Sequence, residues 1–222
     1  MTQAEKILGW MYLVIQLLFL PAILNALNGL LKDPMGPATL NFVYYCINFV
    51  AICCIFATFL KKSFTHAGRS FWDFLQAAVL GFVAYWVCSW LIGHLVQLIR
   101  PGFANVNDAA ISQMAGNSFW LMAIGVVILV PTVEECLYRG LVFRALHSKS
   151  RVAAYLLSMA VFAAIHIIPY VGSSDLLVLL LCFLQYLPAG LCLAWAYEKA
   201  DSLFAPILIH AVINAMGIYA LR

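Results

Sequence analysis

Charge-free apolar runs of about twenty residues recur along the whole chain, and they constrain its fold more than any other feature. A helix needs about 20 mostly apolar residues to cross the hydrocarbon core of a bilayer. The runs of this kind are Ile7–Leu31, Thr39–Leu60, Phe74–Ile99, a run ending at Val133, Val152–Ser174, Leu176–Tyr197 and Ser202–Leu221. We therefore expect an all-α, polytopic membrane helix bundle with about seven transmembrane helices, or eight if one run is split.

The composition of the chain favours the same class. Hydrophobic residues make up 65% of the sequence and charged residues only 9%, whereas a soluble domain carries about a quarter charged residues. Lipid must therefore be the solvent for most of the surface. The net charge is only +3 and no basic stripe is present, so we expect no nucleic-acid partner. The seven cysteines show no metal-ligand spacing, and we expect no disulfides.

The polar connections divide the chain and orient it. Residues 1–100 hold the first three spans, residues 101–118 are expected to form an extracytoplasmic loop, and residues 119–222 hold the remaining helices. The first run is too long for a cleavable signal peptide and is expected to remain as a membrane anchor. Basic residues concentrate in the second, fourth and sixth connections, which predicts a cytoplasmic N-terminus. The segment Ser63–Phe74 either lies along the cytoplasmic interface or forms an ordinary solvated loop.

A carboxylate pair interrupts the fourth apolar region. Ionisable residues inside membrane spans are costly, and each is a candidate for function. On a helix, Glu135 and Arg139 are four residues apart and share a face, which allows an ion pair. Glu134 points about 100° away and escapes that pairing. The sequence therefore predicts that one carboxylate is held by an arginine while the other is free to accept a proton.

Two further polar pairs lie on the later spans. Phe162 and His166 are one helical turn apart, and so are His210 and Asn214. At a rise of about 1.5 Å per residue, Glu134 and His166 lie at similar distances, roughly 20–25 Å, from the turn that joins their helices. Taken singly, each pair is more simply explained as packing. Their compatible depths favour a shared functional pocket.

Other polar residues in the apolar runs have a simpler interpretation. We expect them to form interhelical hydrogen bonds, as amides in membrane helices often do. These residues are Gln16, Asn25, Asn28, Asn48 and Gln185.

Three motifs together resemble a known family. They are E-E-x-x-x-R starting at Glu134, F-x-x-x-H starting at Phe162 and H-x-x-x-N starting at His210, in this order over about the last hundred residues. This set is similar to that of the CPBP family, the CAAX proteases and bacteriocin-processing enzymes that are also called the Abi family. The resemblance implies a glutamate-dependent intramembrane endopeptidase with its active site among the last four helices. Prenylated CaaX proteins, peptide pheromones and bacteriocin precursors, including those of self-immunity systems, are the substrates it implies.

The resemblance also implies a role for each matched residue. The catalytic residues would be Glu134, His166, His210 and Asn214, and the supporting residues Glu135, Arg139 and Phe162. In this scheme Glu134 is the general base that activates water, and His166 helps to hold that water. His210 and Asn214 would stabilise the oxyanion of the tetrahedral intermediate.

Metal dependence and two other function classes stay open at this point. Glu134, His166 and His210 could bind zinc with water in the fourth position. An asparagine one turn after the second histidine suits an oxyanion hole better, so we expect no resident metal or other cofactor. The same three residues could instead serve a transporter or an ion-conducting protein, although no inverted repeat is apparent. A non-catalytic membrane regulator is the remaining alternative.

Overall fold

The computed structural model describes residues 1–220, which form helices and no β-strand. Within this range, six helices are long and apolar enough to cross a membrane. They are Gln3–Gly29, Pro37–Ile55 (α3), Phe71–Ile99 (α5), Phe119–His147, Arg151–Tyr170 and Leu176–Ala200 (α11). A seventh apolar helix, Phe204–Ala220 (α12), is shorter. The predicted helical membrane bundle is confirmed.

Three of the long helices are built from shorter segments. The first joins α1 (Gln3–Val14) to α2 (Leu20–Gly29) through a π-helical turn, Ile15–Phe19. The fourth contains α7 (Phe119–Ile124), a π-helical turn at Gly125–Leu129, α8 (Val130–Glu135), a π-helical segment at Cys136–Phe143 and α9 (Arg144–His147). The fifth consists of α10 (Arg151–Ile167) and a 3₁₀ turn, Ile168–Tyr170. A π turn contains one residue more than an α turn and often lies at a functional site.

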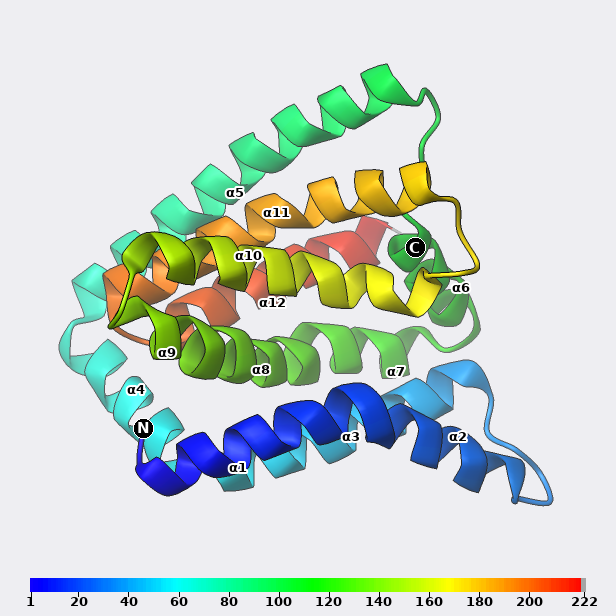
Figure 1. Cartoon of the computed structure of the whole chain (residues 1–222), viewed down its shortest axis with the longest axis horizontal. Coiled ribbons are helices and arrows are strands. Elements are labelled where there is room, and N and C mark those ends of the chain that lie inside the picture. The colour runs from blue at the N-terminus through cyan, green and yellow to red at the C-terminus, as the bar shows by residue number, and fades with distance from the viewer. Residues whose placement is uncertain (221–222) are drawn as a thin grey trace.

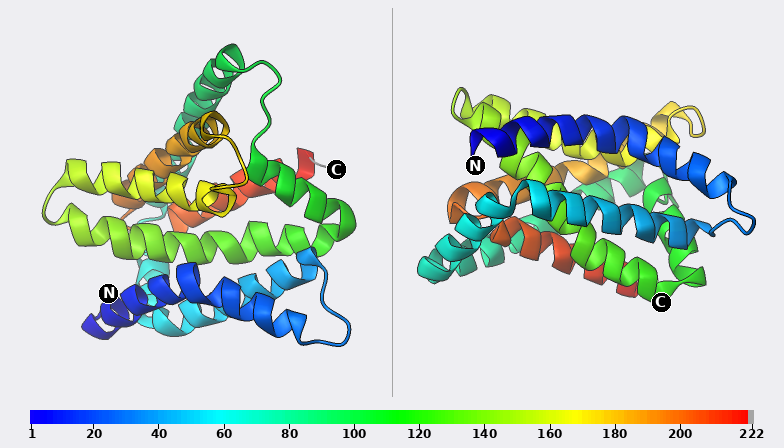
Figure 2. Two further views of the ribbon diagram at one scale, coloured as in Figure 1. Left: turned by 45° about the vertical axis from the view of Figure 1, so that its right-hand side comes forward. Right: turned by 90° about the horizontal axis from the view of Figure 1, so that it is seen from below.

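The helix formed by α7, α8 and α9 lies in the middle of the bundle (Figure 1). The first span and α3 pack on one side of it, and α10 and α12 pack on the other (Figure 2). Behind these, α11 packs against α10, α12 and α5. The central helix and α11 have the largest buried share among the six long spans. The carboxylate pair thus lies on an element that both halves of the chain enclose.

The outer surface of the bundle is apolar. Exposed large side chains include Trp86, Trp90, Trp120, Leu98 and Leu180, which lie on three different spans or their ends. A soluble protein rarely exposes contiguous apolar surface on this scale. Together with the length of the helices, this surface identifies an integral, multi-pass membrane protein.

The segment 101–118 differs from its prediction. It contains a helix, α6 (Val106–Asn117), whereas its Asn, Gly and Ser content predicts an irregular loop. The side chain of Asn105 accepts a hydrogen bond from the backbone N–H of Asn107 and so caps the start of this helix. Asparagine is common at this position of helices as well as in loops. The loop prediction is therefore corrected to a short capped helix between two spans.

The segment Ser63–Phe74 is not a solvated loop either. Its first half belongs to α4 (Ala57–Arg69) and its end begins α5. α4 buries Ser63 and Ala67, which lie one turn apart. The backbone N–H of Leu203 donates a hydrogen bond of 2.6 Å to Ser63 Oγ. α4 is thus fastened to the connection between α11 and α12.

Gly190 allows α10 and α11 to pack closely. A Cβ atom at this position would lie 2.8 Å from the Cα of Met159 and 3.1 Å from its carbonyl oxygen. Because these are backbone atoms, the two helices would have to separate, and such overpacking costs about 1–3 kcal/mol. We expect Gly190→Ala to lower the unfolding midpoint in nanodiscs. Gly93→Ala on α5, where a Cβ would meet nothing within 4 Å, is the matched control. Equal midpoints for the two variants would contradict this account.

Candidate active site

The two adjacent glutamates lie at the end of α8 and point in different directions. Glu135 has an exposed fraction of 0%, whereas Glu134 is only partly buried. Residues adjacent on a helix are separated by about 100°, so one carboxylate faces α12 while the other faces away from it. The side chains of Glu134 and Glu135 therefore differ in burial and in direction, as the sequence predicts.

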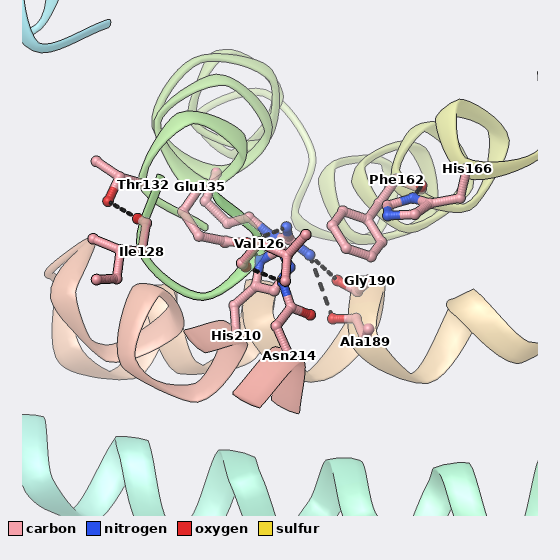
Figure 3. Close-up of polar contacts among 11 residues, drawn as sticks. Val126, Ile128, Thr132, Glu135, Phe162, His166, Ala189, Gly190, His210 and Asn214 are labelled. Atoms are coloured by element: carbon pink, nitrogen blue, oxygen red, sulfur yellow. Dashed lines mark hydrogen bonds and ion pairs between the residues drawn. The ribbon is translucent and has the colours of Figure 1, made fainter. Parts of the chain in front are cut away.

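Glu135 is the centre of a buried polar chain. Its Oε1 accepts a hydrogen bond of 2.9 Å from Arg139 and a second one of 2.8 Å from Nδ1 of His210 (Figure 3). The predicted ion pair between Glu135 and Arg139 is thus confirmed. His210 comes from α12 and is 4% exposed. The contact joins two of the predicted motifs in a way that the sequence does not indicate.

Arg139 extends this chain to α11. Its second terminal nitrogen donates to the carbonyl oxygens of Ala189 and Gly190, at 3.3 and 3.1 Å. The guanidinium lies over the ring of Phe162, 4.5 Å from its centroid, an arrangement that stabilises a buried cation. Planar guanidinium groups suit such multiple contacts better than an ammonium group. Arg139 therefore ties α8, α10 and α11 together, and Phe162 has a supporting contact.

The Glu134 side chain faces a cavity that Glu135 does not line. This cavity of about 130 Å³ lies between the central helix, the first span, α3 and α10. Other lining residues are Gln16, Tyr44, Tyr45, Asn48, Tyr138 and Ile165. The Oε2 atom of Glu134 is buried and has no hydrogen-bond partner in the protein. Burying an acceptor without a partner is costly, so this oxygen is suited to a ligand that brings a hydrogen.

His166 lies one turn beyond Phe162 on α10 (Figure 3). Its Nδ1–H donates a 2.7 Å hydrogen bond to the carbonyl oxygen of Phe162. Its ring stacks on that of Tyr186, with centroids 4.2 Å apart. The Tyr186 hydroxyl accepts a hydrogen bond from Asn107 of α6. Because Nδ1 carries the proton, Nε2 is the ring atom left to accept a hydrogen bond.

Asn214 lies one turn beyond His210 on α12. Its amide donates a 2.7 Å hydrogen bond to the carbonyl oxygen of Val126 (Figure 3). Val126 belongs to the π-helical turn Gly125–Leu129, where the helical hydrogen-bond pattern is altered. The contact holds α12 against the turn that precedes the carboxylates and leaves one amide hydrogen of Asn214 for another partner.

The structure thus distributes the predicted residues over two sides of α8. Glu135, Arg139, Phe162 and His210 are in mutual contact, whereas the cavity at Glu134 is lined by none of them. Ile165, the residue before His166, lines that cavity, whereas His166 itself does not. A larger cavity of about 540 Å³, near Arg144 and Glu198, contains none of the seven predicted residues.

Sequence reasoning missed the contribution of the first two spans to this site. The sequence predicts only interhelical hydrogen bonds for Gln16 and Asn48, and Asn48 does accept a hydrogen bond from Tyr12, at 2.8 Å. Both residues also line the cavity at Glu134. The available signal was their polarity within apolar runs, which does not distinguish a packing amide from one that faces a cavity.

The residues suggested for zinc do not fit a three-ligand site. Within residues 1–220, no group of three or more His, Cys, Asp or Glu side chains is placed to hold a metal ion. Nδ1 of His210 is engaged with Glu135, and the cavity at Glu134 has no histidine in its lining. The mechanism proposed below therefore uses no metal.

Comparison with known proteins finds three curated relatives of this chain, all from Lactococcus lactis subsp. lactis (strain IL1403). UPF0177 protein YbdI is 24% identical over 145 residues, 62% of this chain and 72% of the relative. UPF0177 protein YbdJ is 22% identical over 191 residues, 82% of this chain and 79% of the relative. UPF0177 protein YxdF is 30% identical over 95 residues, 43% of this chain and 47% of the relative.

No solved structure matches the chain. A family model does match, and it covers residues 116–216, which include all three motifs. Its description is type II CAAX prenyl endopeptidase Rce1-like. Residues 116–216 of this membrane protein therefore match the Rce1-like family, as the resemblance of the three motifs predicts.

Proposed function

We propose that this protein is an intramembrane endopeptidase that hydrolyses a peptide bond with water activated by Glu134. Its substrate is a membrane-associated or lipidated peptide or protein, as in CAAX processing, peptide maturation or bacteriocin self-immunity. The family match supports a membrane protease. The observation that carries the mechanism is the buried, unpartnered Oε2 of Glu134 in a cavity between four helices.

The proposed first step is general-base catalysis. Glu134 accepts a proton from a water molecule in its cavity while the water oxygen attacks the carbonyl carbon of the scissile bond. General-base catalysis of this kind contributes about 10²- to 10⁴-fold to a rate. The carbon–nitrogen bond of the tetrahedral intermediate then breaks, and Glu134 returns its proton to the leaving amine. The carboxylate is regenerated at the end of the cycle.

Polar groups on α10 and α12, which do not line the cavity at Glu134, are proposed to support this step when substrate is bound. The Nε2 atom of His166 is left to accept a hydrogen bond, since its Nδ1–H is engaged with Phe162. Asn214 has one amide hydrogen free of Val126. His210 is held through Nδ1 by Glu135, so an imidazolium at this position would donate through Nε2. Donors fixed in advance stabilise the oxyanion without reorganisation.

The proposed orientation gives the substrate a cytoplasmic route. The excess of basic residues in the even-numbered connections supports a cytoplasmic N-terminus, because such residues are retained on that side of the membrane. The apolar exterior of the helices supports lateral access from lipid. A lipidated peptide could reach the site by either path.

Hydrolysis can be tested with the full chain in nanodiscs. Quenched prenylated peptides and leader peptides should be cleaved, and in H₂¹⁸O one heavy oxygen should enter the new C-terminal carboxyl group. A transporter or regulator would leave every peptide intact, and a transporter would instead show flux in liposomes. Intact peptides across both substrate classes would overturn the proposal.

We also propose that hydrolysis needs no resident metal. Because Glu134 activates water by accepting its proton, chelation should leave the rate of peptide cleavage within about twofold of the untreated value, well below the effect of losing a general base. The measurement is cleavage after dialysis against a chelator, together with elemental analysis of the purified protein. Loss of activity that zinc alone restores would contradict this expectation.

A further inference from the structure

Gln16 is a second unsatisfied polar residue beside Glu134. It lies in the π-helical turn Ile15–Phe19 of the first span and is 6% exposed. Its side-chain Oε1 is buried without a hydrogen-bond partner in the protein. The backbone carbonyl of the same residue accepts a hydrogen bond from Tyr44, at 3.4 Å. The backbone is thus held in place while the amide oxygen is left without a hydrogen-bond partner in the protein.

Gln16 and Glu134 line the same cavity. Each contributes a buried oxygen that has no partner, and two acceptors cannot satisfy one another. Leaving a buried acceptor unpaired costs about 1–3 kcal/mol, and these two acceptors belong to residues that line one cavity. The pair therefore indicates a ligand that brings at least two hydrogens.

The size of the cavity helps to identify this ligand. Its volume of about 130 Å³ leaves room for water, since a single water needs a space of only roughly 10–15 Å³. A water molecule carries two hydrogens and can donate one to each oxygen. Buried waters of this kind commonly make about three hydrogen bonds to groups that would otherwise be unpaired. Water thus satisfies both acceptors and is also the substrate that hydrolysis consumes.

We propose that Gln16 is a further catalytic residue, whose amide oxygen holds the nucleophilic water against Glu134. This inference rests on the proposed function and adds to it a residue outside the matched segment 116–216. Before the reaction, one hydrogen of the water is donated to Glu134 and the other to Gln16. The oxygen lone pairs are then left for the scissile carbonyl. The first span thereby becomes part of the active site.

The π-helical turn gives this role a structural basis. A π turn contains an extra residue, and it changes the direction of side chains relative to the preceding α-helix. The turn Ile15–Phe19 contacts α3 through the Tyr44 hydroxyl, and Tyr44 and Asn48 of α3 also line the cavity. Gln16 is thus presented to the cavity by an irregularity in an otherwise regular span.

The experiment compares Gln16→Met with Leu17→Met in the peptide-cleavage assay. Leu17 lines the same cavity, so its variant controls for a change of shape alone. We expect Gln16→Met to lower kcat about 10- to 100-fold, less than the loss of the base itself, with KM changed by less than about twofold. Leu17→Met should keep kcat within about threefold of the parent value, as volume-conserving apolar exchanges usually do.

A second variant, Gln16→Glu, separates a catalytic role from a structural one. It keeps an acceptor oxygen, so activity should persist, but two carboxylates in one cavity resist simultaneous ionisation. The pH–rate profile should therefore move towards higher pH. The pH–rate profile of Gln16→Glu also tests the role of Gln16 if the Gln16→Met protein fails to fold.

The outcomes for Gln16 and Glu134 are distinguishable. Parental kcat for Gln16→Met, or an unchanged pH profile for Gln16→Glu, overturns the role of Gln16 while an inactive Glu134→Gln protein keeps the proposed function intact. Full activity of Glu134→Gln would overturn the proposed mechanism and the role of Gln16 together.

Discussion

Cleavage by a Glu134→Gln protein is expected to fall by about 10²- to 10⁴-fold, the usual contribution of a general base. Glutamine has nearly the shape of glutamate but cannot accept a proton from water. Because Glu134 has no hydrogen-bonded partner at Oε2, this change breaks no contact that stabilises the fold. KM and the unfolding midpoint should therefore stay close to those of the parent protein. The whole loss should appear in the rate constant of single-turnover cleavage, measured in nanodiscs.

Glu198→Gln is the matched control for this experiment. Glu198 is paired with His147 and Arg151 near the end of α11 and does not line the cavity at Glu134. Glu198→Gln should therefore keep most of the cleavage rate of the parent protein. Comparable rates for the two variants would show that Glu134 is not the base.

Replacing Arg139 with methionine is expected to destabilise the folded protein by about 3–5 kcal/mol, as happens when one partner of a buried ion pair is removed. Glu135 would keep its charge in a place with an exposed fraction of 0%. The carbonyl oxygens of Ala189 and Gly190 would also lose their donor. The measurement is equilibrium unfolding in mixed detergent micelles, followed by tryptophan fluorescence.

A double variant separates the charge from the packing. In Glu135→Leu with Arg139→Met, no buried charge is left without its partner, so stability should recover part of the loss. Cleavage should stay low, because His210 loses the carboxylate that holds its Nδ1. If Arg139→Met alone were as stable as the parent protein, the pair would not be a structural support.

The sequence predicts the spans well because each depends on local composition alone. The observed helix Leu176–Ala200 begins at the residue that hydropathy indicates and extends only three residues beyond the predicted end. The ion pair of Glu135 with Arg139 is equally local, since four residues on a helix define a face. By contrast, α6 is missed because Asn105 is as typical of a helix cap as of a loop.

Other features depend on how distant segments meet. His210 and Glu135 are 75 positions apart in the chain, and no periodicity in either segment indicates that they touch. Gln16 is assigned to interhelical bonding for the same reason, because the cavity that it faces is formed by four separate helices. The π turns are also missed, since a pattern of 3.6 residues per turn does not anticipate one extra residue.

The π-helical turn Gly125–Leu129, which meets Asn214 through Val126, also sets the helical phase of everything that follows it. Its extra residue turns the succeeding side chains by about 100° relative to the start of the helix. If the same residues formed a regular α turn, Glu134 would occupy the phase that Glu135 has and would face His210. Which of two neighbouring, chemically identical carboxylates contacts His210 and which lines the cavity therefore depends on the register of a single turn.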